Sequence, residues 1–209
     1  MDKYPSKLLK DAVEAISSLP GVGSRSALRL ALHLLKQPSE NIHHFAAAID
    51  RLADEVKYCR CCNMIADDDV CTICADERRD HTTVCVVESV RDVMSVENTA
   101  QYHGVYHVLG GIISPINGIG PSDLNISGLL SRVNEAEGAL EVILALSGDV
   151  EGETTAFYLY RQLEATPAFK LGRLKVSTLA RGLGFGDDLE YADSLTLGRS
   201  ITGRQPFRP

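Results

Sequence analysis

Four cysteines in two close pairs constrain this chain more than any other feature of its sequence. The pairs are Cys59-x2-Cys62 and Cys71-x2-Cys74, separated by eight residues. Two turns of this kind facing each other hold one tetrahedral Zn²⁺ through four thiolates, and such a closed site leaves no position open for chemistry. The spacing therefore predicts a small structural zinc finger whose ligands are Cys59, Cys62, Cys71 and Cys74.

Two further cysteines have different expected roles. Cys61 could replace a neighbour in the first pair, although a C-x-C spacing is less usual, and Cys85 lies in an apolar run typical of a buried strand. Disulfides are the alternative interpretation of the cysteine pattern. The first residues contain no apolar run typical of a secretory signal, so we expect a reducing compartment, the cytoplasm.

The charge of the 209-residue chain is unevenly distributed. The formal net charge is −7, which argues against a protein that coats nucleic acid with its whole surface. Residues 1–36 carry six Lys or Arg against three Asp or Glu, a balance of +3, which leaves −10 for the remaining residues. This asymmetry favours local DNA contact, with a solvated helix surface as the alternative. No apolar stretch is long enough to span a bilayer.

The basic N-terminal region contains two predicted helices joined by a tight turn. Helical spacing of apolar residues covers 7–18, Leu19-Pro20-Gly21-Val22-Gly23 interrupts it, and a second helix is expected from about 24 to 36. Gly21 and Gly23 permit positive φ and close approach of another molecule. The turn also presents the N-terminus of the second helix, which favours phosphate.

A basic stripe follows this turn. Arg25, Arg29, His33 and Lys36 share one face of the second helix, and Lys3, Lys7 and Lys10 repeat the spacing on the first. The arrangement resembles a helix-hairpin-helix element, which grips the sugar-phosphate backbone without reading bases. We therefore predict DNA contacts at Gly21, Gly23, Arg25 and Arg29; a purely structural helix corner is the alternative. His33, His43 and His44 are expected at the surface or at caps rather than as metal ligands.

From residue 82 onward the sequence alternates between strands and helices. Strands are expected at 83–87, 105–109, 141–146 and 173–179, and helices at 91–98, 127–137 and 154–164. The Gly- and Pro-rich segment 110–121 between them should be an ordered surface loop. This alternation predicts an α/β domain with a mostly parallel sheet and right-handed crossovers.

Acidic residues follow two of these strands. Glu88 ends the first strand, and Asp149, Glu151 and Glu153 follow the third. Because ligands gather at the carboxyl ends of parallel strands, neighbouring strands would bring Glu88, Glu151 and Glu153 together as oxygen ligands suited to Mg²⁺. The alternative is that Glu151 and Glu153 complement the dipole of the following helix.

Over nearly its whole length the sequence resembles the bacterial RecR family of recombination mediators. Several ordered motifs carry this resemblance besides the hairpin and the four cysteines. They are Val86-Val87-Glu88, Tyr106-His107-Val108-Leu109-Gly110-Gly111, Ser114-Pro115, Gly118-Ile119-Gly120-Pro121, Glu151-Gly152-Glu153-Thr154 and Leu189-Glu190-Tyr191-Ala192-Asp193. Arg25 stands where the family commonly has Lys, and Thr178 and Gly184 stand where it more often has Arg and Pro.

The resemblance implies four regions. They are a helix-hairpin-helix DNA-binding region at 1–55, a four-cysteine zinc finger at 56–78, a Toprim domain at 79–178, and a Walker-B-like segment with a C-terminal oligomerisation tail at 179–209. Toprim domains elsewhere hold Mg²⁺ through a Glu and a D-x-D pair. Glu88 matches the first position, and Glu151-Gly152-Glu153 replaces the pair with longer side chains.

The resemblance also implies a role and partners. The family is not credited with catalysis; it acts in repair of gapped DNA as a clamp and adaptor that works with RecO and RecF to load RecA onto strands covered by SSB. We therefore expect a non-enzymatic homo-oligomer, a dimer or tetrameric ring, that exchanges its N-terminal helices and its tail, with Arg199, Arg204 and Arg208 in that tail. The sequence lacks G-x-x-x-x-G-K-[ST], so residues 181–190 do not make it an NTPase.

Two alternatives stay open at the level of sequence. One is a Mg²⁺-dependent Toprim nuclease, since the Toprim fold serves enzymes as well and a fold does not fix a function. The other is a zinc-stabilised protein-interaction module without DNA affinity of its own. A topoisomerase or a primase is not expected, because about a hundred residues outside the α/β domain leave no room for their additional parts.

Overall fold

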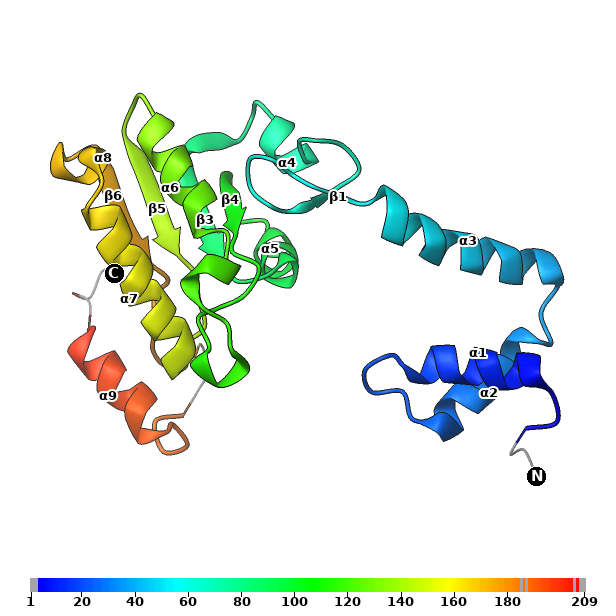
Figure 1. Ribbon diagram of the computed structural model, residues 1–209. Helices are drawn as coiled ribbons and strands as arrows, with labels where there is room; N and C mark the ends of the chain where they lie inside the picture. Colours follow the sequence, from blue (N-terminus) through cyan, green and yellow to red (C-terminus); the bar gives the residue numbers. More distant parts are fainter. Residues whose placement is uncertain (1–3, 185, 187, 205, 207–209) are drawn as a thin grey trace. The chain divides into compact units, whose positions relative to one another are not determined.

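A computed structural model describes residues 4–184, 186, 188–204 and 206. The chain divides into two compact units, with the boundary between Val56 and Lys57. Figure 1 shows the first unit in blue to cyan and the second in cyan to red. None of the described helices is long and apolar enough to cross a membrane.

Three helices lie in the described part of the first unit: α1 (Lys7–Ser17), α2 (Ser24–Leu34) and α3 (Ser39–Glu55). Val13 of α1 packs against Ala27 and Ala31 of α2 in a small core. The small side chains on α2 let the two helices approach closely, which confirms the predicted helical hairpin. The helix α3 was not expected from the sequence, and none of its residues is buried.

The second unit begins with the cysteine-rich segment. Two short antiparallel strands, β1 (Lys57–Tyr58) and β2 (Ile65–Ala66), pair with each other, and one helical turn, α4 (Thr72–Ala75), follows. Each pair of cysteines lies at a tight turn: Asn63 donates its N–H to the Cys59 carbonyl at 2.8 Å, and Ala75 to the Cys71 carbonyl at 3.0 Å.

A parallel sheet forms the centre of this unit. Its strands are β3 (Asp80–Val87), β4 (Gly104–Val108), β5 (Leu140–Leu144) and β6 (Leu174–Thr178), in the order β4-β3-β5-β6. All four predicted strands are present. The parallel order across β3 and β5 confirms the expected α/β architecture with helical crossovers.

Helices cover the two faces of the sheet unequally (Figure 1). On one face, α6 (Ile126–Glu135), α7 (Val150–Glu164) and α8 (Pro167–Lys170) enclose the main core with buried side chains from β3, β4, β5 and β6. On the other face, α5 (Val90–Glu97) packs against β3 and β4. After β6 the chain continues to α9 (Ser194–Thr202). Neither α8 nor α9 was expected from the sequence.

The helix α7 begins four residues before its predicted start at 154. The side chain of Asp149 accepts a hydrogen bond from the Gly152 N–H at 2.7 Å and so caps the helix at Val150. The predicted ordered loop at 110–121 is confirmed. It contains one 3-10 turn, η1 (Pro115–Asn117), and a second, η2 (Pro121–Asp123), begins at its last residue. A bridge pairs Ser114 with Ile119.

The zinc-finger segment covers the free edge of the sheet at β4. The Val108 N–H donates to the Cys62 carbonyl at 2.7 Å, and the Asn63 side chain donates to the Val108 carbonyl at 3.1 Å. From α6, Arg132 donates to the Tyr106 carbonyl at 2.9 Å. An open edge strand invites pairing with another chain, so the finger and α6 protect the sheet by occupying these groups.

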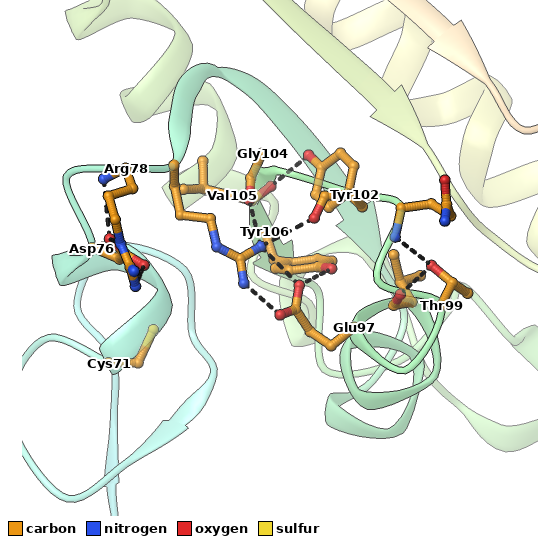
Figure 2. A network of polar contacts seen from close by, with 12 residues as sticks. Cys71, Asp76, Arg78, Glu97, Thr99, Tyr102, Gly104, Val105 and Tyr106 are labelled. Atoms are coloured by element: carbon orange, nitrogen blue, oxygen red, sulfur yellow. Dashed lines mark hydrogen bonds and ion pairs between the residues drawn. The ribbon is translucent and has the colours of Figure 1, made fainter.

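A polar network connects the end of the finger to the sheet (Figure 2). Arg79 forms an ion pair with Glu97 of α5, in which one guanidinium nitrogen lies 2.9 Å from the carboxylate, and it also donates to the Gly104 carbonyl at 3.2 Å. The Tyr106 hydroxyl donates to the same Glu97 carboxylate at 2.6 Å. The hydrogen bond from Arg79 lowers the pKa of Glu97, so the carboxylate is ionised at neutral pH.

Removing the hydroxyl of this network should destabilise the second unit. We expect Tyr106→Phe to lower the free energy of unfolding by about 1.5–3 kcal/mol, the usual worth of a hydrogen bond to a charged group. Chemical denaturation with zinc present measures this loss. In a Glu97→Ala background the same substitution should cost much less, because its acceptor is already gone; an equal cost in both backgrounds would show that the hydroxyl acts elsewhere.

The buried His107 makes stability depend on pH. Its imidazole is 1% exposed, and its Nε2 lies 2.7 Å from the Asn125 carbonyl. Burial lowers the pKa of His107 to about 4, so the ring is neutral in the fold. The unfolded chain protonates below its ordinary pKa of about 6.5, so stability should fall by roughly 3 kcal/mol as the pH drops from about 6.5 to about 4.

Denaturation of the wild type and of His107→Asn at pH 7 and pH 5 tests this expectation. Saturating zinc is needed in both samples, since acid also weakens thiolate ligation. The wild type should lose more stability than the variant between these two pH values. Equal losses would assign the pH dependence to other groups.

Candidate zinc site and nucleic-acid interface

The four predicted zinc ligands converge at one point. The sulfur atoms of Cys59, Cys62, Cys71 and Cys74 all lie within 4.8 Å of one another, and those of Cys62 and Cys71 are 3.6 Å apart. A tetrahedral site with Zn–S bonds of about 2.3 Å separates its sulfurs by about 3.8 Å, so the observed arrangement fits Zn²⁺. The predicted structural zinc is therefore confirmed, and Cys61 lies outside the ligand set.

Local backbone geometry holds these thiols in place. The Cys74 N–H points at the Cys71 sulfur at 3.4 Å, and the Cys59 N–H donates to the Met64 carbonyl at 2.7 Å. Cys59, Cys62 and Cys71 are buried and Cys74 is half-buried, whereas Cys61 is exposed. Such a closed, buried thiolate site stabilises the fold and offers no position to a substrate.

The turn between α1 and α2 has the geometry expected of a phosphate-binding hairpin. Gly21 has φ +79°, which glycine adopts without strain, and a Cβ at Gly21 or Gly23 would meet no atom within 4 Å. Both glycines are therefore open to an incoming molecule. Gly23 is the N-cap of α2, and the first N–H groups of a helix, which have no partner within it, suit an anion.

The basic stripe on α2 borders a shallow groove. Arg25, Leu28, Arg29, Leu32, His33 and Lys36 line it, and its volume is about 440 Å³. Within the described part of the chain, Arg25, Arg29 and Lys36 have no carboxylate within salt-bridge distance. Positive charges without internal partners are available to an external anion.

The three predicted magnesium ligands have separate partners in the structure. Glu88 accepts a hydrogen bond from the Ser147 N–H at 2.5 Å and so links the ends of β3 and β5. Glu151 accepts from the Ser114 hydroxyl at 2.6 Å and fixes the 110–121 loop to α7. Among the described residues, the cysteine cluster is the one group of three or more potential ligands that lie close together.

Glu153 contacts two arginines. Arg181 and Arg199 lie 2.6 Å and 2.7 Å from the same oxygen of its carboxylate. Arg181 also donates to the Ser147 carbonyl at 3.2 Å. Glu153 thus attaches the segment after β6 and the helix α9 to the start of α7, and the two guanidinium groups neutralise its charge without a metal ion.

The Walker-B-like segment is only partly described. Phe185 and Asp187, as well as Arg208 of the tail and Lys3 of the first basic stripe, lie outside the described residues. Gly182 lies close to Ser200 of α9, and the Leu183 N–H donates to the Ser200 hydroxyl at 3.0 Å. Arg204 donates to the Ile201 carbonyl at 3.1 Å. The contacts of Gly182 and Leu183 with Ser200 join the segment to α9 within one chain.

Comparison with known protein families matches four successive segments that together cover most of the chain. A RecR helix-hairpin-helix family model matches residues 9–53, a RecR four-cysteine zinc finger domain 56–76, a Toprim domain 82–175, and a RecR C-terminal model 182–205. Together with the zinc site and the basic helix α2, these matches define a modular protein of DNA recombination and repair.

Full-length relatives identify the family. The chain is 56% identical over 207 residues to recombination protein RecR of Porphyromonas gingivalis, covering 99% of this chain and 97% of the relative. It is 55% identical over 205 residues to recombination protein RecR of Bacteroides thetaiotaomicron, covering 98% and 97%. The corresponding protein of Flavobacterium johnsoniae is 51% identical over 205 residues, covering 98% and 96%. The chain belongs to the RecR family.

Two features that bear on the candidate sites were not predicted from the sequence. The ion pairs of Glu153 with Arg181 and Arg199 join residues 28 and 46 positions apart, and no local pattern relates residues at such separations. The apolar stripe of α3, by contrast, has a readable signal: Phe45, Ile49 and Leu52 follow helical spacing, and all three are more than half exposed.

Proposed function

We propose that this chain is a non-enzymatic DNA clamp and adaptor that loads RecA onto SSB-covered gapped DNA together with RecO and RecF. Membership of the RecR family supports a mediator role in recombination and repair. The observation that carries the proposal is the basic groove on α2, whose Arg25, Arg29 and Lys36 have no ion-pair partner among the described residues, beside the open glycines of the hairpin. The proposal places this activity in the cytoplasm, where thiolate ligands stay reduced.

The DNA contact in this proposal is made by the backbone of the hairpin and by Arg25 and Arg29. N–H groups at the start of α2 and two guanidinium groups complement phosphates and carry no base information. Binding should therefore be poorly sequence-specific and weaken steeply as salt increases. Gly21 and Gly23 contribute by leaving the phosphate room to approach.

The proposed clamp requires self-association of the chain. In α3, no residue is buried, and Phe45, Ile49 and Leu52 are 55%, 55% and 59% exposed along one face. An amphipathic helix needs a surface for its apolar face, and a second copy of the chain would supply one. Several copies around one DNA molecule would add their phosphate contacts and offset the net charge of −7.

Proposed roles for the acidic residues are structural rather than catalytic. Each of Glu88, Glu151 and Glu153 has a partner within the chain, and Glu153 faces two arginines. Two-metal hydrolysis needs carboxylates that converge on metal ions about 4 Å apart. The alternative of a Toprim nuclease is therefore not favoured, and the basic groove disfavours a module without DNA affinity.

Purified zinc-loaded protein and gapped DNA test the clamp directly. Light scattering over a concentration series should show an oligomer, Phe45→Ser with Ile49→Ser should shift it toward monomer, and the oligomer should retard gapped DNA. Incubation with Mg²⁺ or Mn²⁺ should leave the DNA intact. A strict monomer that binds DNA equally well would contradict the clamp, and cleavage abolished by Glu88→Gln would establish the nuclease.

A further inference from the structure

A second cationic site lies in the unit that carries the zinc finger. A cleft of about 590 Å³ separates the finger from α6 and the start of β5. Its walls include the side chains of Arg60, His81 and Arg132, the thiols of Cys61 and Cys74, and one carboxylate, Glu135. The cleft thus has more basic side chains than carboxylates, although it lies in the part of the chain that carries the net negative charge.

The two arginines of the cleft differ in how firmly they are held. Arg132 is half-buried, and its donation to the Tyr106 carbonyl at 2.9 Å fixes the guanidinium against the sheet edge. Arg60 is exposed and, within the part of the chain that the structure describes, has no carboxylate at salt-bridge distance. One fixed and one exposed guanidinium on the same concave surface suit a small, strongly charged anion.

We propose that this cleft binds a backbone phosphate of single-stranded DNA, as a second contact besides the helical hairpin. The inference rests on the proposed DNA-binding function. Proteins that hold single strands without reading bases use a positively charged groove along the backbone. A second contact on the same chain raises the affinity for a strand already held by the first.

An acidic peptide fits this cleft less well than a phosphodiester. Adding a peptide strand requires free backbone groups at a sheet edge. At β4 three of these groups are occupied, because Val108 is bonded to Cys62 and Asn63, and the Tyr106 carbonyl accepts from Arg132. The apolar lining consists of small or buried residues, Gly128, Ala136 and Leu140, with no deep pocket for a large anchoring side chain.

Cys61 provides a built-in reporter for occupancy of the cleft. It is the one exposed cysteine among the six, since Cys74 is half-buried and the others are buried. In zinc-loaded protein, iodoacetamide should therefore alkylate Cys61 first. We expect an excess of oligo(dT) to slow this alkylation severalfold at low salt and to lose the effect at high salt; Cys61→Ala confirms the labelled position.

Competing outcomes are separated by a second probe. Protection by poly-glutamate but not by oligo(dT) would overturn DNA as the occupant. Binding of oligo(dT) with no change in the alkylation rate would show that the DNA does not occupy the cleft. The arginines would then only balance the charge of the zinc thiolates. Failure of the wild type to bind any DNA would instead overturn the proposed function together with this inference.

Substitution of Arg60 gives an independent test of phosphate binding in the cleft. Arg60→Ala should reduce the slope of log affinity against log salt for oligo(dT) by about 0.7, the value of one phosphate contact on a single strand. Arg161→Ala removes an equally charged, exposed residue of α7 outside the cleft and should leave the slope unchanged. Zinc content measured on both variants shows that the finger is intact. An unchanged slope for Arg60→Ala would contradict the proposal.

Discussion

Replacing Cys62 by Ser is expected to release the metal and unfold the zinc finger. Zinc binding in small fingers has an apparent free energy of about 10–16 kcal/mol at pH 7, and most of the folding free energy of such a segment comes from it. The damage should extend beyond the finger, because the Cys62 carbonyl accepts the Val108 N–H and covers the edge of β4. Loss of zinc should therefore lower the thermal midpoint and promote aggregation through the exposed edge.

The adjacent Cys61 supplies a matched control. Cys61→Ser also replaces a cysteine sulfur by oxygen, but this thiol lies outside the ligand set. Zinc content and thermal midpoint should therefore stay at the wild-type level. Elemental analysis of both variants and of the wild type, purified without chelator, provides the measurement. Less than one zinc per wild-type chain, or zinc loss in Cys61→Ser, would contradict the assignment of the four ligands.

Removing Arg25 and Arg29 together should have the largest effect on DNA binding. Each phosphate contact contributes about −0.9 to the slope of log affinity against log salt on duplex DNA, so the double alanine variant should lose about 1.8 of this slope. Binding should weaken for all sequences alike, because backbone contacts carry no base information. Titration of duplex and gapped DNA at several salt concentrations measures both effects.

The control for the double variant removes two positive charges as well, but at positions far from the hairpin in the sequence. Arg161 and Lys170 lie on α7 and α8 of the second unit, so their double alanine variant alters the net charge equally without touching the hairpin. We expect its salt slope to match that of the wild type. If the two double variants behaved alike, net charge rather than the α2 stripe would account for DNA binding.

Local patterns in the sequence predicted the zinc finger, the helical hairpin and the parallel sheet. The C-x2-C spacing suffices because the ligands of each pair are neighbours, and their geometry follows from a single turn. The strands were readable because residues 84–87 of β3 form a continuous, buried apolar run, and because every residue of β4 is buried. Cys85 was correctly expected as a buried residue of such a run.

Long-range side-chain pairing could not be predicted in the same way. Glu153 follows β5 as a magnesium ligand would, but its orientation depends on Arg181 and Arg199, which arrive from the segment after β6 and from α9. The predicted start of α7 was four residues too late for a local reason. Asp149 was interpreted as one of the acids after the strand and not as the N-cap of the helix. Placement of the finger on β4 depends on backbone groups, which leave no trace in side-chain patterns.

The most direct test of the central proposal is assembly of RecA on gapped DNA covered by SSB. The cognate RecO and RecF are added with the wild-type chain or with the Arg25→Ala, Arg29→Ala variant, and RecA binding is followed over time. The proposal predicts that the wild-type chain accelerates RecA assembly, that the variant does so much less, and that the DNA stays uncut. RecA assembly at the same rate with and without the wild-type chain would contradict it.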